Sequence, residues 1–304
     1  MAQDLAETVV SSAAPLQAER RRADSPEALP PKELWFHRRV HLRAAVTELV
    51  DYRVLALTLA ERDLRARYKQ ALLGWAWAIL TPLMLMFVFT FVFTKFAHVD
   101  TGGVPYPLFA YVGLVPWTFF SNAVNGGGMS LITNMPLLNK MYCPREVFPL
   151  AAMAVAAVDA LLSVIVLGVI FVVEGSAPHV QALWAPVLLL VELVFTIAVS
   201  LAVAALLVYV RDLRHALPLL LQVALYATPV AYGLSAIAKS RTFVLVYSGL
   251  NPLAPVIDGF RRTILHGQLP DWTALGIGAA SSTLLLAVAY LLFKRLETGM
   301  ADIA

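Results

Sequence analysis

The sequence predicts an all-α membrane protein with six transmembrane helices. Hydrophobic residues make up 60% of the 304 residues and charged residues only 14%, whereas a typical soluble domain carries roughly 25% charged residues. Six mostly apolar stretches are long enough to cross the hydrocarbon core, because about 20 helical residues span its thickness of about 30 Å. These observations exclude an ordinary soluble domain.

The charged residues are concentrated before the first apolar stretch, since 12 of the 23 Lys and Arg residues lie in the first 70 positions. Residues 1–33 are rich in Ala, Ser, Pro and charge and have no sustained apolar period, so we expect a disordered cytoplasmic tail there. No apolar segment typical of a cleavable signal peptide precedes Leu49. Insertion is therefore expected to depend on the helices themselves.

Residues 34–70 follow a different pattern, in which apolar residues recur at helical spacing and charged residues crowd the second half. The apolar positions are Val46, Val50, Val54, Leu57, Leu64 and Tyr68. This pattern predicts an amphipathic helix on the cytoplasmic membrane surface. A solvated helix in a small soluble head is the alternative.

Residues 71–304 are expected to form the transmembrane domain. None of its six apolar stretches contains Lys or Arg, and they run over Leu72–Thr94, Leu108–Thr133, Val147–Val173, Leu183–Val210, Ala216–Ile237 and Trp272–Phe293. A seventh apolar stretch, Phe243–Ile257, is short and carries Pro252 and Pro255. We expect it to be an external re-entrant segment before the last helix.

The orientation follows from the basic residues that flank the spans. Six crossings place the polar head, Lys140 with Arg145, Arg211 with Arg214, and Lys294 with Arg295 on one side. That side is predicted to be cytoplasmic, with both termini inside, in the cytoplasmic (inner) membrane. The external loop before the last helix departs from the rule, because it contains Lys239, Arg241, Arg261 and Arg262.

Several classes of site are not expected in this chain. Cys143 is the only cysteine and the six histidines are scattered, so the sequence has no metal-binding or redox motif. The triplet Gly126, Gly127 and Gly128 lies in an apolar span and is not a phosphate-binding P-loop, so close helix packing or local flexibility is its expected role. The sequence pI of about 9.0 is explained by the membrane-flanking cations, and nucleic-acid binding is not expected.

Five segments in order resemble the type-2 ABC exporter permeases. They are Arg67–Trp77 with Pro82 shortly after it, Tyr106–Asn122, Asn139–Glu146, Arg211–Arg214, and Asn251–Arg261. The resemblance covers Val50 to the C-terminus and is closest to the permeases that export lipid-linked polysaccharides such as O-antigen, capsule and teichoic-acid precursors. It implies a permease that dimerises with a second copy of itself and has no catalytic residues or cofactor of its own, since two copies of a separate ATPase subunit bind ATP and Mg²⁺.

The loop between the second and third spans is the expected docking site for that ATPase subunit. Pro136 and Pro144 bound a short segment with charges of both signs, which can form a short helix that projects from the membrane. The expected docking residues are Leu137, Leu138, Asn139, Lys140, Tyr142, Pro144, Arg145, Glu146, Arg211 and Asp212. An ordinary solvated loop is the alternative.

A substrate path is expected along the second span, where aromatic residues are dense. Ring faces can stack on sugar C–H surfaces, and Trp and Asn side chains can also hydrogen-bond to hydroxyl groups. The candidates are Tyr111, Trp117, Phe120, Asn122 and Asn125. For any single ring, packing or lipid contact is the simpler explanation.

Asp159 and Glu192 are carboxylates inside the third and fourth spans. A charged group in the membrane is costly and suggests a function, although a protonated or paired structural group is the simpler interpretation. The leading hypothesis is a permease for a lipid-linked glycan. The alternatives are an exporter of a drug, antibiotic or lipid, a polyprenyl-phosphate transferase, and an assembly scaffold.

Overall fold

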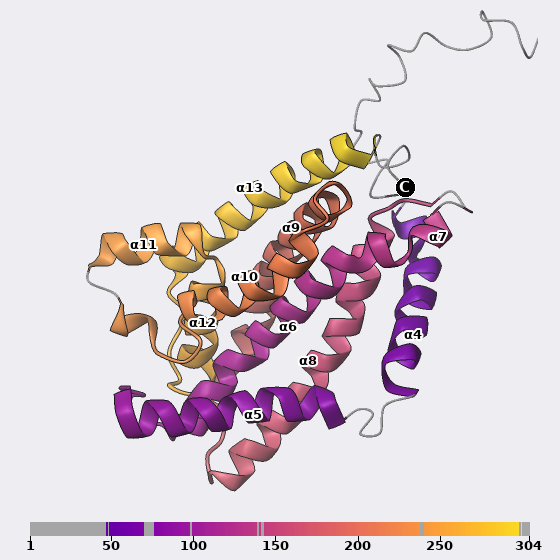
Figure 1. Ribbon diagram of the computed structural model, residues 1–304. Helices are drawn as coiled ribbons and strands as arrows, with labels where there is room; N and C mark the ends of the chain where they lie inside the picture. Colours follow the sequence, from indigo (N-terminus) through magenta and orange to yellow (C-terminus); the bar gives the residue numbers. More distant parts are fainter. Residues whose placement is uncertain are drawn as a thin grey trace, which may run out of the picture. The chain divides into compact units, whose positions relative to one another are not determined.

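The computed structural model describes residues 47, 49–69, 76–97, 99–138, 140, 143–237, 240–297 and 299. The expected tail 1–33 lies outside the described residues, as do Val46, Asn139 and Tyr142. Every regular element in the described part of the chain is helical (Figure 1). The all-α prediction is therefore confirmed.

Four helical segments are long and apolar enough to cross a membrane. Ala76–Phe96 combines α5 (Ala76–Val92) with most of a π-helical turn, η2 (Phe93–Ala97), and Val180–Tyr209 combines a 3₁₀ turn, η3 (Val180–Trp184), with α9 (Ala185–Tyr209). The other two are α8 (Val147–Val173) and α13 (Trp272–Glu297). They coincide with four of the six expected spans and make the chain a multi-pass membrane protein.

The other two expected spans differ from these four. Helix α6 (Tyr106–Thr133) has 28 residues but is less apolar, because glycine, serine and asparagine interrupt it. Helix α10 (Leu213–Ala227) has 15 residues, or about 22 Å of helix, and the chain leaves the helix before Pro229. The count of six crossings therefore stays a prediction.

A sharply bent helix pair precedes α13. The chain bends by 115° between helix α11 (Arg241–Leu250) and helix α12 (Leu253–Ile264), at Asn251 and Pro252. Pro252 lacks an N–H and stands at the N-cap of α12, where a missing donor is tolerated. The pair is a broken span or a re-entrant segment, and it overlaps the expected short stretch Phe243–Ile257.

Helix α6 lies at the centre of the bundle and packs mainly against α8 and α9 (Figure 1). Glycines allow this close approach: a Cβ at Gly127 would lie 1.9 Å from Ser200 Oγ, and one at Gly128 would lie 2.6 Å from Val203 Cγ1. The glycine cluster therefore provides the close helix packing expected of it.

Helix α4 (Arg53–Lys69) runs beside α8 and buries Leu59, Ala60 and Tyr68. Val54 and Leu57, which the sequence places on the apolar face, are exposed. Leu59 and Ala60 pack in one cluster with Phe148 of α8. Part of the polar head is thus attached to the flank of the bundle.

Candidate functional site

A cavity of about 370 Å³ opens between α4, α5, α6 and α8. Its polar lining consists of Arg67, Tyr68, Thr81, Thr118, Ser121, Asn122, Asp159 and Ser163, and its rings are those of Trp77, Trp117 and Phe119. The volume lies within the range of about 300–1,000 Å³ that is usual for ligand pockets. The cavity therefore joins hydrogen-bonding groups, a cation and aromatic surfaces in one place.

An ion pair closes one side of the cavity. Arg67 Nη1 donates to Asp159 Oδ2 at 2.7 Å, and the Tyr68 hydroxyl donates to Asp159 Oδ1. Burial, followed by the hydrogen bond to Asp159, raises the pKa of Tyr68 to about 12, so its hydroxyl keeps its proton at neutral pH. The expected membrane carboxylate Asp159 is therefore paired with the end of α4.

The expected substrate-path residues separate into two groups. Trp117 and Asn122 line the cavity. Tyr111 is fully buried in the core, Phe120 stacks on Phe195 with ring centroids 5.3 Å apart, and Asn125 is exposed outside the cavity lining. Tyr111 and Phe120 thus lie in the packed core, where the Tyr111 hydroxyl has no hydrogen-bond partner among the described residues, and their place on the substrate path stays a prediction.

Sequence patterns did not select several cavity residues: Arg67, Tyr68, Trp77, Thr81 and Ser163. Arg67 and Tyr68 occur in the first of the family-like segments, but their partner Asp159 is about ninety positions away in the chain. One sequence feature could have pointed to such a partner. Asp159 is an acidic residue inside an apolar span, and a carboxylate there requires a hydrogen-bond donor or a cation from another segment.

The basic end of the bundle is the end that carries Lys140, Arg145, Arg211, Arg214 and Lys294. Tyr209 donates to the Leu296 carbonyl at 2.6 Å, and this bond joins the last turns of α9 and α13. Arg145 Nη1 donates to the Glu297 carbonyl at 2.7 Å. The cations predicted to share one side therefore do share one end of the bundle.

The expected docking residues differ in their accessibility at this end. Lys140, Arg211 and Asp212 are exposed, and Leu137 and Leu138 of the short helix α7 (Met135–Leu138) are partly exposed. Pro144 is buried. Glu146 is 2% exposed and forms an ion pair with Lys294, which also lies 2.9 Å from Glu297 Oε2. Glu146 and Arg145 thus attach the loop to α13.

Glu192 differs from Asp159. It is fully buried in α9, and neither of its carboxylate oxygens has a hydrogen-bond partner among the described residues. Its backbone carbonyl accepts a bond of 2.7 Å from Thr196 Oγ1. The structure therefore gives Glu192 no ion pair within the described part of the chain.

Arg261, whose position breaks the positive-inside pattern, is buried in α12. Its guanidinium donates to the carbonyls of Phe109, Pro229, Val230 and Tyr232, and it lies 3.8 Å from the centre of the Phe109 ring. A buried charge requires such partners. Arg261 therefore ties α12 to α6 and to the segment after α10.

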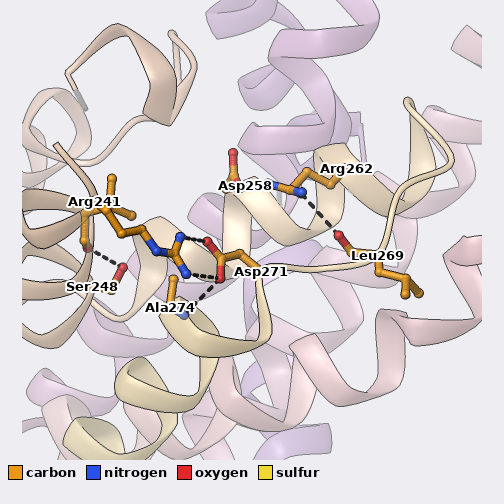
Figure 2. Close-up of polar contacts among 8 residues, drawn as sticks. Arg241, Ser248, Asp258, Arg262, Leu269, Asp271 and Ala274 are labelled. Atoms are coloured by element: carbon orange, nitrogen blue, oxygen red, sulfur yellow. Dashed lines mark hydrogen bonds and ion pairs between the residues drawn. The ribbon is translucent and has the colours of Figure 1, made fainter. Parts of the chain in front are cut away.

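A second polar cluster joins the bent pair to α13 (Figure 2). Arg241 Nη2 donates to Asp271 Oδ1 at 2.9 Å, and Asp271 Oδ1 accepts a bond of 3.2 Å from the Ala274 N–H. Arg262 donates to the Leu269 carbonyl at 3.2 Å and lies 3.9 Å from Asp258. The hydrogen bond from Arg241 lowers the pKa of Asp271 to about 2, so this carboxylate stays ionised.

The described residues contain no group of three or more His, Cys, Asp or Glu side chains arranged to hold a metal ion. The chemistry available at both ends of the bundle is hydrogen bonding, ion pairing and ring stacking. These interactions bind and position a ligand or a partner.

Comparisons with known proteins show which family this chain resembles. A family model described as ABC-2 type transporter matches residues 55–265. The O-antigen export system permease protein RfbA of Myxococcus xanthus is 34% identical over 258 residues, which cover 84% of this chain and 98% of that protein.

Two further relatives are more distant. The O-antigen export system permease protein RfbA of Klebsiella pneumoniae is 27% identical over 250 residues, covering 82% of this chain and 94% of the relative. The polysialic acid transport protein KpsM of Escherichia coli is 23% identical over 244 residues, covering 79% and 92%. Since the family model spans more than half of the sequence, the chain belongs to the ABC-2 type transporter family.

Proposed function

We propose that this chain is the permease subunit of an ATP-driven exporter that moves a lipid-linked polysaccharide across the cytoplasmic (inner) membrane. The cavity carries the proposal, because it combines the groups that bind sugars. Asn122, Thr118 and Ser121 offer hydrogen bonds to hydroxyl groups, and Trp77 and Trp117 offer ring faces. The names of the relatives RfbA and KpsM support a glycan cargo.

The basic end is the proposed docking surface for a separate ATPase subunit, which supplies the ATP- and Mg²⁺-binding site. Lys140, Arg211 and Asp212 are exposed there, next to the partly exposed Leu137 and Leu138. Asn139 and Tyr142 belong to the same proposed surface. Because Arg145 and Glu146 bind the end of α13, a displacement of this loop would be passed to a membrane span.

The proposed assembly contains two copies of this chain and two ATPase subunits. Large apolar side chains are exposed along α5 and α10, including Met84, Phe87, Phe91, Leu219, Leu220 and Val223. In the membrane such faces contact lipid or another protein span. We propose that two copies enclose the transport path between them.

The proposed topology has six crossings, formed by α5, α6, α8, α9, α10 and α13, with both termini in the cytoplasm. The basic end then faces the cytoplasm, in line with the positive-inside rule. In this topology α11 and α12 form an external re-entrant segment. The polar head is proposed to carry an interfacial helix in which α4 packs on α8.

Deletion of the gene tests the function directly. The expected result is loss of the surface polysaccharide and accumulation of its lipid-linked form inside the cell, measured by immunoblotting and by lipid extraction. Restoration by the wild-type gene is the control. Unchanged surface polysaccharide would contradict the proposal.

Charge reversal tests the docking surface. Lys140→Glu combined with Arg211→Glu is expected to reduce co-purification of the ATPase subunit, because both side chains are exposed at the basic end. Lys95→Glu is the matched control, since Lys95 is an exposed cation in the turn after α5. Equal recovery of the ATPase with both variants would exclude this docking surface.

A further inference from the structure

Arg67 is the only basic residue among the described residues that line the cavity. It stands two residues before the end of α4, and its side chain is 48% exposed. Its partner Asp159 is only 7% exposed. The cation therefore faces accessible space while its counter-ion lies in the wall.

The Arg67 guanidinium has further N–H donors that can bind a second anion. It carries five N–H groups in a planar fork, of which the bond from Nη1 to Asp159 uses one and a contact with the Tyr68 side chain engages another. The fork matches the oxygens of a phosphate, with which it forms paired charge-assisted hydrogen bonds. A phosphate that enters the cavity can thus share Arg67 with Asp159 or replace Asp159.

Asp159 does not lose all its partners when Arg67 turns to another anion. The Tyr68 hydroxyl donates to its other oxygen, and the pKa of Tyr68 of about 12 keeps that proton in place. A buried carboxylate that retains a strong hydrogen bond avoids the full cost of an unpaired charge. Asp159 therefore holds Arg67 in position while the cavity is empty.

The surroundings suit a ligand with an apolar tail. Trp77 and Thr81 of α5 line the cavity. Farther along the same helix Met84, Phe87 and Phe91 are each more than half exposed. A hydrocarbon chain attached to an anionic head in the cavity can therefore lie along the exposed apolar face of α5.

We propose that the cavity binds the phosphate or diphosphate group that joins the glycan to its lipid carrier. When this group binds, the Arg67 guanidinium leaves its ion pair with Asp159 and pairs with the phosphate oxygens instead. Trp117 and Asn122 then lie beside the first sugar. The inference rests on the proposed function and specifies which part of the cargo this cavity recognises.

Binding of farnesyl diphosphate to the purified full-length chain tests the proposal, measured by isothermal titration calorimetry in detergent. Arg67→Gln is expected to weaken binding by about tenfold or more, the usual effect of losing a charge-assisted hydrogen bond. Asp159→Asn is expected to tighten binding, because it frees the guanidinium while Tyr68 retains an acceptor. Arg67→Lys, which keeps the charge but not the fork, is expected to lie between wild type and Arg67→Gln.

Arg65→Gln is the matched control, since Arg65 lies on the same helix and pairs with Glu61 outside the cavity. It is expected to bind like the wild type. Farnesol and inorganic diphosphate separate the two parts of the ligand, and both are expected to bind more weakly than farnesyl diphosphate. Equal binding of farnesol would show a site for apolar lipid, and equal binding of inorganic diphosphate would show a site for a free anion; either result would overturn the proposal.

The inference and the proposed function fail in different ways. If Arg67→Gln, folded like the wild type by thermal unfolding, binds farnesyl diphosphate equally well, the inference is wrong. Loss of surface polysaccharide in the deletion strain would still support the exporter function. If surface polysaccharide persists without the chain, the proposed cargo is wrong, and with it the assignment of the cavity to that cargo.

Discussion

Gly113 and Arg261 are residues whose roles depend on each other. A Cβ at position 113 would lie 2.5 Å from Arg261 Nη2 and 2.9 Å from the Val230 carbonyl oxygen. The absence of a side chain in α6 therefore makes room for a buried guanidinium that is bonded to four backbone carbonyls.

Gly113→Ala is expected to destabilise the protein by about 1–3 kcal/mol, because overpacking forces Arg261 away from its acceptors. Gly126→Ala is the control on the same helix. The nearest atom to its new Cβ would be Ala152 Cβ at 3.6 Å, and alanine favours a helix by up to about 1 kcal/mol over glycine. Thermal unfolding in detergent measures both; equal loss of stability in the two variants would contradict this role of Gly113.

At the residue scale, the sequence identified acidic residues within apolar spans but did not identify the side chains that pair with them. It selected Asp159 and Glu192 by the same argument, since both are acids within apolar spans. The structure separates them, because Asp159 meets Arg67 and Tyr68 whereas neither Glu192 carboxylate oxygen has a partner among the described residues. Such pairs depend on packing between distant segments, which a periodic pattern does not specify.

At the scale of elements, hydrophobicity located the long helices and was less informative for the polar and short ones. The third apolar stretch and α8 have the same bounds, Val147–Val173. The fifth stretch was expected to reach Ile237, but α10 ends at Ala227 because Pro229 follows and Thr228 adopts an extended backbone. The chain is non-helical from Thr228 to Gly233, where the Pro229 and Val230 carbonyls accept bonds from Arg261, and then forms a 3₁₀ turn, η4 (Leu234–Ala236).

The contact between the 143–146 loop and α13 yields a prediction about two elements. Lys294→Met is expected to destabilise the protein by up to about 3–5 kcal/mol, because it leaves the nearly fully buried Glu146 without its cation. Glu146→Gln added to Lys294→Met is expected to recover most of this loss, since it removes the unpaired charge. Thermal unfolding of the single and double variants tests this. Additive losses would show that the two side chains are not energetically coupled.

At the scale of the whole molecule, the side of the membrane on which each end lies is a prediction from basic residues alone. The cations of the basic end are close together because α6, α8, α9 and α13 all have a terminus there. Geometry places these residues together but does not assign them to the cytoplasm. Labelling of single cysteines is therefore the decisive measurement.

Cys143 is a poor site for such labelling. It is 6% exposed, and burial raises the pKa of its thiol. Since the thiolate is the reactive form, a raised pKa lowers the reactive fraction at neutral pH. The wild-type chain is expected to react slowly with a membrane-impermeant maleimide from either side.

In a Cys143→Ala background, Lys140→Cys and Ser176→Cys introduce exposed thiols beyond the two ends of α8. Lys140→Cys is expected to react with the impermeant maleimide in inverted vesicles but not in intact cells, because a cytoplasmic basic end is accessible only in the vesicles. Ser176→Cys is expected to show the opposite pattern, since α8 lies between the two positions and crosses the membrane once. Labelling of both from one side would show that α8 does not cross, and exchange of the two patterns would place the basic end outside.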